Sequence, residues 1–419
     1  MIKAKVAILH YSAPPVIGGV EAVIKAHVDQ FVQAGYPCTV IAGRGDGAAL
    51  PKGSDFIRIP EIDSQHPDVI KINRDLEKGR VPEDYERFES HLAKILEPVA
   101  GEFDHLIVHN VFTKHFNLPL TGALYRLLDQ GAIRQAISWG HDFTWTSPSS
   151  RSKVHPGYPW DMLRTMRDDT TYVVVSKERQ RALASLYNCP LDQIDVVYNG
   201  VDPSQNLGIS EAGSALIESL GLLESGMNIL MPVRVTEAKN IEFALKVLRE
   251  LKIKGKRPML VVTGPPDPHS TTSMEYYQSL QRMRDELGVG DCMRFVFESG
   301  PEPDEPFYIN ERIVGDLLRV SDVMFMPSHR EGFGMPVLEA GMAGVLVVSS
   351  VVPAAKELAE EEAVIISLDD DPCQVAERMV EKLEQSPISR LRRRVRQNYT
   401  WRAIFNSKIR PLVTDGGKV

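Results

Sequence analysis

The segment 328–340 constrains the fold of this chain most, because two glycines, a proline and two glutamates follow directly on an apolar run. That run, residues 322–327, ends in a proline and predicts a buried parallel strand. Pro336 suits the first turn of a helix, since the first turn leaves its N–H groups unpaired in any case. The segment therefore predicts a strand, a loop and a helix, the repeating unit of open α/β sheets.

Ligands of open α/β sheets bind beyond the carboxyl ends of the strands, where a helix N-terminus offers unpaired N–H groups and the positive end of its dipole. A diphosphate suits such a place. Glu331 in the predicted loop and Glu339 in the predicted first helical turn can face one ligand and accept hydrogen bonds from vicinal hydroxyls. Each glutamate alone also has a structural explanation, because the dipole favours acidic residues and glycines permit a tight turn.

The whole string EGFGMPVLEA resembles the EGFGxxxLEA signature of the retaining nucleotide-sugar glycosyltransferases of family four. The resemblance implies the α/β fold class called GT-B, with two Rossmann-like domains facing each other across a cleft and a C-terminal helix crossing back to the N-terminal domain. It also implies that Glu339 holds the donor ribose and that Glu331 contacts the transferred sugar. Gly332, Phe333 and Gly334 are expected to bind the donor.

The chain length of 419 residues exceeds what a single core usually supports, so two domains are expected. We expect an N-terminal acceptor-side domain over 1–205 and a C-terminal nucleotide-sugar-binding domain over 206–395. A last helix over 396–419 is expected to pack back on the N-terminal domain. The arginine-rich run 390–396 fits that helix, and a basic face that contacts a membrane is the alternative interpretation.

The formal net charge of −8 argues against a nucleic-acid-binding protein, whose contact surface would be basic. The four cysteines lie far apart without a CxxC motif, so neither a zinc site nor a disulfide framework is indicated, and a cytoplasmic location fits. No apolar run approaches the roughly 18–20 residues of a transmembrane helix. Peripheral membrane contact and assembly into a homo-oligomer stay open.

The N-terminal part begins with a strand over 6–10, a loop with glycines over 12–21 and an amphipathic helix to residue 34, which predicts a Rossmann-like unit. The loop lacks GxGxxG, which removes the main support for a dinucleotide oxidoreductase. Gly18 and Gly19 resemble the family's mobile N-terminal loop, whose amides approach the donor diphosphate, and an ordinary turn explains the pair equally well. Residues 73–100 are expected to be helical.

A strand beginning at residue 136 leads into a His-Asp pair that resembles the family's HD element. That resemblance places His141 near the donor sugar, and a hydrogen-bonded structural histidine is the alternative. The segment 145–160 carries Arg151, Lys153 and His155, and it predicts either a mobile loop that contacts an anionic acceptor or a solvated insertion.

Arg234 and Lys239 follow a predicted strand, and their spacing resembles the family's R(x4)K motif. Two cations there can neutralise a nucleoside diphosphate as it leaves. Gly264 resembles the family's glycine near the nucleotide. The aspartates 369–371 precede Pro372, where aspartates cap helices, so we expect no metal site and no cofactor besides the donor substrate.

We therefore expect a retaining, metal-independent hexosyltransferase, with His141, Arg234, Lys239 and Glu331 as its catalytic residues. It would move a hexose from a nucleoside-diphosphate sugar, with GDP-mannose or UDP-glucose favoured, to a hydroxyl of a small polar or anionic sugar. The resemblance implies that the departing diphosphate takes the acceptor proton, and no opposed carboxylate pair is evident. The alternatives are a GT-B sugar-nucleotide epimerase, a lipid- or polysaccharide-directed glycosyltransferase, and a sugar-nucleotide-binding protein without activity.

Overall fold

Two parallel β-sheets, each in its own compact unit, form the computed structural model, which describes residues 3–267, 273–300, 302, 305–359 and 361–414. Within the described residues, unit 1 runs to Gly200 and resumes at Trp401, and unit 2 is Val201–Thr400. The expected α/β class with two Rossmann-like units is confirmed. Unit 2 begins at residue 201 and ends at residue 400, where the sequence placed these boundaries at 206 and 395.

The sheet of unit 1 has the strand order β3-β2-β1-β4-β5-β6-β7, and neighbouring strands are parallel. Every residue of β1, β4 and β5 is buried, as expected for strands covered by helices on both faces. The strands are β1 (Val6–Ser12), β2 (Cys38–Arg44), β3 (Asp55–Arg58), β4 (His105–His109), β5 (Ala136–Gly140), β6 (Thr170–Val174) and β7 (Ile194–Val196).

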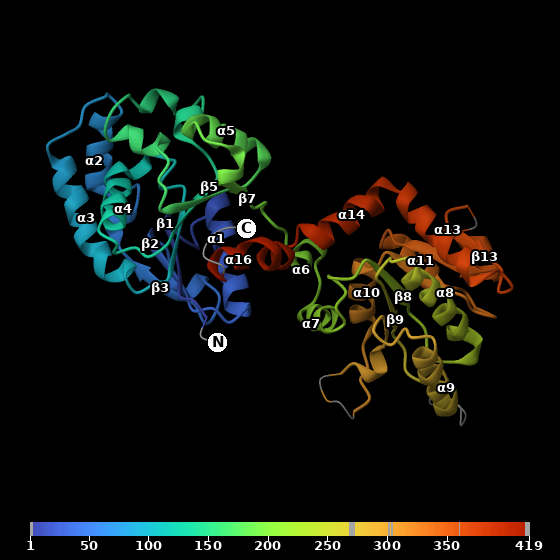
Figure 1. The fold of residues 1–419 in the computed structure, drawn as a ribbon. Coiled ribbons are helices and arrows are strands. Elements are labelled where there is room, and N and C mark those ends of the chain that lie inside the picture. The colour runs from blue at the N-terminus through green and yellow to red at the C-terminus, as the bar shows by residue number, and fades with distance from the viewer. Residues whose placement is uncertain (1–2, 268–272, 301, 303–304, 360, 415–419) are drawn as a thin grey trace. The chain divides into compact units, whose positions relative to one another are not determined.

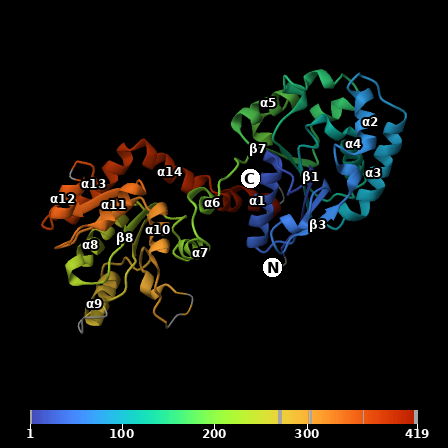
Figure 2. The same cartoon turned by 180° about the vertical axis from the view of Figure 1, so that it is seen from behind.

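The helices of unit 1 include α3 and α4, which lie side by side in both views of the molecule (Figure 1 and Figure 2). The expected helix over 73–100 is wrong, because α2 ends at Leu76 and α3 begins only at Asp84. Gly79 has a φ of +78° and Pro82 cannot donate a hydrogen bond, so the chain turns between the two helices. The helices are α1 (Gly19–Gln33), α2 (Pro67–Leu76), α3 (Asp84–Ala100), α4 (Leu118–Asp129) and α5 (Lys177–Tyr187).

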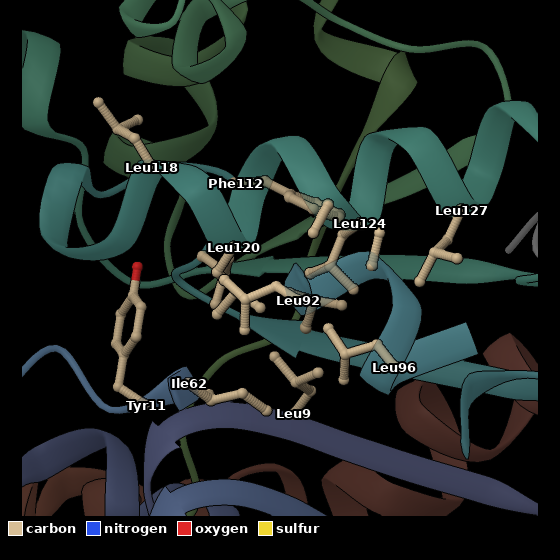
Figure 3. Close-up of a cluster of buried hydrophobic side chains, with 14 of the residues drawn as sticks. Leu9, Tyr11, Ile62, Leu92, Leu96, Phe112, Leu118, Leu120, Leu124 and Leu127 are labelled. Carbon is tan, nitrogen blue, oxygen red and sulfur yellow. The ribbon is translucent and has the colours of Figure 1, made fainter. Parts of the chain in front are cut away.

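The core on one face of this sheet joins β1 to α3 and α4 (Figure 3). Leu92 of α3, Leu124 of α4 and Leu9 of β1 have no exposed surface. Burying a leucine side chain of this kind stabilises the fold by about 1.5–3 kcal/mol. The core therefore holds β1 and its neighbour β4 in place, and these strands carry residues of the candidate site at their carboxyl ends.

The C-terminal segment returns to unit 1, as the sequence predicts. It is not one helix, because the chain continues from α15 (Trp401–Ile404) through a π-helical turn, Phe405–Ile409, into α16 (Arg410–Thr414). The ring of Phe405 meets that of Phe31 of α1 at 5.1 Å and 90°. Residues 415–419 of the expected helix lie outside the described residues.

The sheet of unit 2 has the order β10-β9-β8-β11-β12-β13, again with parallel neighbours. The direction in which strands are added reverses between β8 and β11, which makes their carboxyl ends the expected place for a ligand. The strands are β8 (Met227–Met231), β9 (Pro258–Val262), β10 (Met293–Phe295), β11 (Val323–Met326), β12 (Leu346–Ser350) and β13 (Val364–Ile366).

The helices of unit 2 end with α14, which carries the arginine run. Arg396 is 7% exposed and pairs at 2.7 Å with Asp322, and Arg393 is also buried and pairs with Glu384 at 3.3 Å. The run therefore does not present a uniform basic face. The helices are α6 (Pro203–Leu207), α7 (Glu211–Ser219), α8 (Ile241–Ile253), α9 (Ser273–Glu286), α10 (Glu311–Val320), α11 (Met335–Met342), α12 (Pro353–Ala359), α13 (Pro372–Gln385) and α14 (Pro387–Asn398).

None of the helices in the described part of the chain has the length and apolar character that crossing a membrane would require.

Candidate functional site

The loops after β8 and β11 are joined directly in unit 2. These two strands are neighbours in the sheet, and the backbone N–H of His329 in the second loop donates to the carbonyl of Ala238 in the first, at 2.9 Å. The contact aligns residues that lie about ninety positions apart in the sequence. It brings the predicted residues Lys239 and Glu331 to one edge of the sheet.

Lys239 and Glu331 form the best-defined charged pair of this edge. The Lys239 Nζ lies 2.7 Å from Glu331 Oε1, and the hydroxyl of Ser328 donates to the same oxygen at 2.5 Å. The Glu331 side chain is only 9% exposed and that of Lys239 22%, so solvent screens the pair little. Two hydrogen bonds to Oε1 fix the carboxylate, and Oε2, which accepts none from the described residues, is the oxygen that a ligand can use.

Ser328 and Ser350 support this carboxylate, and the sequence analysis did not identify either of them. The Ser350 hydroxyl at the end of β12 donates to the Ser328 carbonyl at 2.5 Å. Ser328 lies three positions before Glu331 in the same loop, a spacing that could have suggested a contact. Nothing in the sequence points to Ser350, because its role depends on β12 lying beside β11.

The loop before α8 places Lys239 where its charge is unfavourable without a partner. A 3-10 turn, Glu237–Lys239, is followed by Asn240 at φ +50°, and Asn240 caps the helix by accepting from the N–H of Phe243. A cation at a helix N-terminus is opposed by the helix dipole. Glu331 therefore compensates Lys239 in the absence of a ligand.

Among the described residues, Arg234 pairs with Asp267 and not with Glu331. Its side chain is 61% exposed and its guanidinium is 4.0 Å from the Asp267 carboxylate. A Cβ at Gly264 would lie 2.6 Å from the carbonyl oxygen of Val233 and 2.7 Å from Arg234 Cα, so only glycine lets the loop after β9 lie against this backbone. Gly264 thus shapes the Arg234 loop. The convergence of Arg234 with Lys239 on a diphosphate stays a prediction, as does an approach of the nucleotide to Gly264.

The helix that follows Glu331, α11, has Gly334 as its N-cap residue, whose φ of +84° favours glycine. Glu339 was expected in the first turn, and this is wrong: the helix begins at Met335, so Glu339 lies in the second turn. Its side chain and that of Phe333 are exposed, the latter by 63%. A Cβ at Gly332 would meet no atom within 4 Å, so packing does not require a glycine there.

Of the aspartates 369–371, Asp371 serves a helix end, as predicted. Asp371 is the N-cap of α13 and accepts from the backbone N–H of Cys373 at 3.2 Å. Across the described residues, no group of three or more His, Cys, Asp or Glu side chains is placed to hold a metal ion.

In unit 1, Gly18 is the N-cap residue of α1 and Gly19 begins the helix. A Cβ at Gly18 would collide with the carboxylate of Glu21, which is 9% exposed and accepts from the Ser12 hydroxyl at 2.5 Å. Glycine at 18 therefore makes room for a carboxylate that stabilises the helix N-terminus. Contact of these amides with a donor diphosphate stays a prediction, and the phosphate would meet the charge of Glu21.

His141 follows β5 and is held from two sides. Its Nε2 lies 2.9 Å from Nδ1 of His109, and its backbone N–H donates to Oδ1 of Asn110 at 2.8 Å. Asn110 follows β4 with a φ of +61°. Burial lowers the pKa of His141 to about 4 and the pKa of His109 well below its usual range, so both rings are neutral at pH 7.

Two further histidines, His10 and His27, surround this pair, and the sequence analysis missed them together with His109. His10 donates from Nδ1 to the His109 carbonyl at 2.9 Å, and the rings of His27 and His109 are 5.5 Å apart. His10 and His109 both lie near the carboxyl ends of adjacent strands, β1 and β4. That placement is the signal that could have grouped them with His141.

The segment with Arg151, Lys153 and His155 is tied down in unit 1. The Arg151 guanidinium lies 4.4 Å from the Trp145 ring, Lys153 Nζ is 2.9 Å from the Glu77 carboxylate, and His155 Nε2 is 3.1 Å from the Glu77 carbonyl. The side chains of Trp145, Val154, Trp160 and Leu163 are buried in the core. The expectation of a solvated insertion is therefore wrong, and contact of the three basic residues with an acceptor stays a prediction.

Two family models match the chain, and together they span both units. The model described as Glycosyltransferase Family 4 matches residues 17–205, and the model described as Glycosyl transferases group 1 matches residues 215–400.

Two curated relatives and one solved structure illustrate the similarity. The chain is 28% identical over 192 residues to an uncharacterised glycosyltransferase of Methanocaldococcus jannaschii, and the alignment covers 45% of this chain and 44% of the relative. It is 26% identical over 278 residues to the D-inositol 3-phosphate glycosyltransferase of Frankia alni, and this alignment covers 62% of this chain and 64% of the relative. The chain thus spans less than two thirds of the length of these relatives.

The sucrose-phosphate synthase of Thermosynechococcus elongatus is 15% identical, with 99% of this chain and 100% of that chain covered, at a TM-score of 0.39. That TM-score is too low to add to the argument, which rests on the two family matches and on the two parallel sheets. On these grounds the chain belongs to glycosyltransferase family 4, and its C-terminal unit is of the glycosyl transferases group 1 type.

Proposed function

We propose that the protein is a retaining glycosyltransferase that moves a hexose from a nucleoside-diphosphate sugar to a hydroxyl of a small polar acceptor. The observation that carries the proposal is the Lys239–Glu331 pair beside the N-terminus of α11. The ammonium group can neutralise a leaving diphosphate, and Oε2 of Glu331, which has no partner among the described residues, is available to a sugar hydroxyl.

The proposed reaction needs no base from the protein. Loss of the nucleoside diphosphate creates negative charge, which Lys239, Arg234 and the N-terminus of α11 would stabilise. The departing diphosphate would take the proton of the acceptor hydroxyl on the same face of the sugar. His141 is a weak base because burial lowers its pKa to about 4, which supports assigning the proton to the diphosphate.

The donor and the acceptor are the finer part of the proposal. GDP-mannose and UDP-glucose are the donors we favour. A small anionic polyol is the favoured acceptor, supported by the name of the Frankia alni relative, which specifies D-inositol 3-phosphate. A sugar-nucleotide epimerase and a lipid- or polysaccharide-directed glycosyltransferase are the competing functions.

Release of nucleotide with and without acceptor separates these functions. The purified protein would be incubated with GDP-mannose or UDP-glucose, alone or with inositol phosphate, and product formation followed by mass spectrometry. We expect nucleotide release only when an acceptor is present, together with a glycosylated acceptor. Release of free sugar without acceptor would indicate an epimerase, and transfer only to lipid-linked or polymeric acceptors would contradict the small acceptor.

Replacing Glu339 with alanine is expected to weaken donor binding by about 10- to 100-fold, because a charge-assisted hydrogen bond to the ribose is worth about 1.5–3 kcal/mol. Isothermal titration with the nucleoside diphosphate measures the effect. Glu311→Ala is a matched control, since Glu311 is an exposed glutamate in the first turn of α10 in the same unit. Equal affinities for the two variants would rule out the ribose contact.

Treatment with EDTA is expected to leave activity largely intact, because Lys239, Arg234 and the N-terminus of α11 would supply the positive charge that a metal ion supplies elsewhere. Initial rates before and after dialysis against the chelator measure this. Loss of activity that Mg²⁺ or Mn²⁺ restores would contradict the metal-independent reaction.

A further inference from the structure

The rings of His109 and His141 share a single hydrogen between Nδ1 of His109 and Nε2 of His141, which lie 2.9 Å apart. Both rings are buried and neutral, so each carries one N–H and one bare nitrogen. Either His109 donates from Nδ1, or His141 donates from Nε2. The two arrangements differ in what they leave at the outer nitrogens of the pair, Nε2 of His109 and Nδ1 of His141.

The outer nitrogen of His109 decides between them. Its Nε2 is buried and, within the described residues, has no hydrogen-bond partner. If His141 donated, the hydrogen of His109 would sit on this Nε2 as an orphaned N–H. Buried N–H groups without an acceptor are rare in proteins, and a bare acceptor nitrogen is tolerated somewhat better.

The aromatic neighbours do not rescue such an N–H. The ring of Trp139 is stacked on His109 with 23° between the planes, so a hydrogen in the plane of the imidazole does not point at the indole face. The ring of His27 lies 5.5 Å away, and both of its nitrogens are buried without a partner among the described residues, so neither of them accepts from Nε2 of His109. The surroundings of His109 therefore favour a bare Nε2.

We propose that His109 is a positioning residue that donates from Nδ1 to Nε2 of His141 and fixes His141 in the tautomer with its hydrogen on Nδ1. Among the described residues, Nδ1 of His141 has no other partner, so this N–H is available to a ligand. The identity of this ligand rests on the proposed function, in which it is a hydroxyl oxygen of a substrate. His141 is then a neutral hydrogen-bond donor.

The backbone around the pair supports this role. The carbonyl of His109 accepts from Nδ1 of His10, and the adjacent residue Asn110 accepts from the backbone N–H of His141 through its side chain. His109 and His141 are thus each held by a second contact from neighbouring segments. The orientation of the His141 ring about these contacts depends on the hydrogen bond from His109.

Nitrogen NMR of the full chain with labelled histidine reads the tautomer directly. We expect His141 to show a protonated Nδ1 and a bare Nε2 at pH 7, assigned by the loss of its signals in His141→Gln. A protonated Nε2 on His141 would overturn the proposal. The spectrum needs no substrate, so a failure of the proposed function would not affect this result.

Two replacements of His109 separate positioning from packing. His109→Asn places an amide near the position of Nδ1 and is expected to keep both the tautomer and the turnover. His109→Leu removes the donor and is expected to give mixed tautomers and about a tenfold lower kcat with little change in the KM of the donor. His27→Leu is the control in the same cluster, because His27 makes no hydrogen bond to the pair among the described residues.

The outcomes of this series distinguish the two proposals. A fixed Nδ1–H tautomer in His109→Leu would overturn the role of His109. Loss of the tautomer in His109→Leu without a change in kcat would uphold the positioning role and contradict a contact between His141 and a substrate. Equal losses in the leucine and asparagine variants would show that His109 only fills space and would overturn the proposal.

Discussion

Replacing Lys239 with alanine is expected to lower kcat by about 10²- to 10³-fold, the usual loss when a group that stabilises transition-state charge is removed. The ammonium group lies 2.7 Å from Glu331 and the Lys239 side chain is only 22% exposed, so the charge acts where solvent screens it little. The charge of the diphosphate increases as it leaves, so the loss should fall on kcat more than on donor binding. Steady-state rates at saturating donor and acceptor measure it.

The pairing with Glu331 makes the effect non-additive. Lys239→Ala removes the cation that pairs with Glu331, whose side chain is only 9% exposed. Glu331→Ala removes the carboxylate that compensates Lys239 at a helix N-terminus. We expect the double variant to lose less than the product of the two single losses, as residues in one network do. Lys252→Ala is the matched control, because Lys252 forms an exposed pair of similar length, 2.6 Å, with Asp291 in the same unit.

Two outcomes would contradict this role of Lys239. A change in donor affinity alone, with kcat unaltered, would show that its charge does not act on the leaving group. Strictly multiplicative losses in the double variant would show that the Lys239–Glu331 contact does not link the two functions.

Acidification is expected to destabilise unit 1 by about 3 kcal/mol or more between pH 7 and pH 4, because one pKa unit is worth about 1.4 kcal/mol. Burial lowers the pKa of His27 to about 3 and those of His115 and His141 to about 4. In the unfolded chain these imidazole rings have the ordinary pKa of about 6.5 and bind protons when the pH falls below that value. In the folded chain they stay neutral down to their lowered pKa values. The contribution of these rings to the free energy of unfolding is therefore fully present above pH 6.5, and it is lost as the pH is lowered towards 4.

Tryptophan fluorescence follows this transition in unit 1 alone. All four tryptophans of the chain, Trp139, Trp145, Trp160 and Trp401, belong to unit 1. Urea unfolding monitored at pH 7, 5.5 and 4 gives the change in free energy of unfolding.

His27→Leu should reduce the slope of stability against pH. It should also raise stability at pH 7, because two buried nitrogens without partners among the described residues are removed. His91→Leu, at a position 52% exposed, is the control. An unchanged slope in His27→Leu would contradict the burial of a neutral imidazole at this position.

The two-unit architecture could be predicted from the sequence because the central strands, such as β1, β4, β8 and β11, are short apolar runs. The pairing of Lys239 with Glu331 could not, since it depends on β8 lying beside β11 and on the backbone contact between Ala238 and His329. The histidine cluster could be predicted only in part, because His10 and His109 stand at the ends of predicted strands, while the contacts of His109 with His27 of α1 and with His141 depend on how the chain folds. Sequence spacing carries no information on such contacts.

Local signals in the sequence do mark two further features of unit 1. Gly79 and Pro82 mark the break between α2 and α3, and that break exposes Glu77 to the contacts of Lys153 and His155. Trp145 and Trp160 are large apolar side chains that favour burial, which is where the structure places them. The basic residues around them therefore hold the segment in place, whether or not they also meet an acceptor.

The configuration of the transferred sugar tests the central proposal most directly. The protein would be incubated with GDP-mannose or UDP-glucose and inositol phosphate, and the anomeric proton of the purified product examined by NMR. If the protein is a retaining transferase with Lys239 and Glu331 at its donor site, the product has the same anomeric configuration as the donor. The Lys239→Ala variant should form no detectable product in the same time. An inverted linkage, or free sugar as the only product, would contradict it.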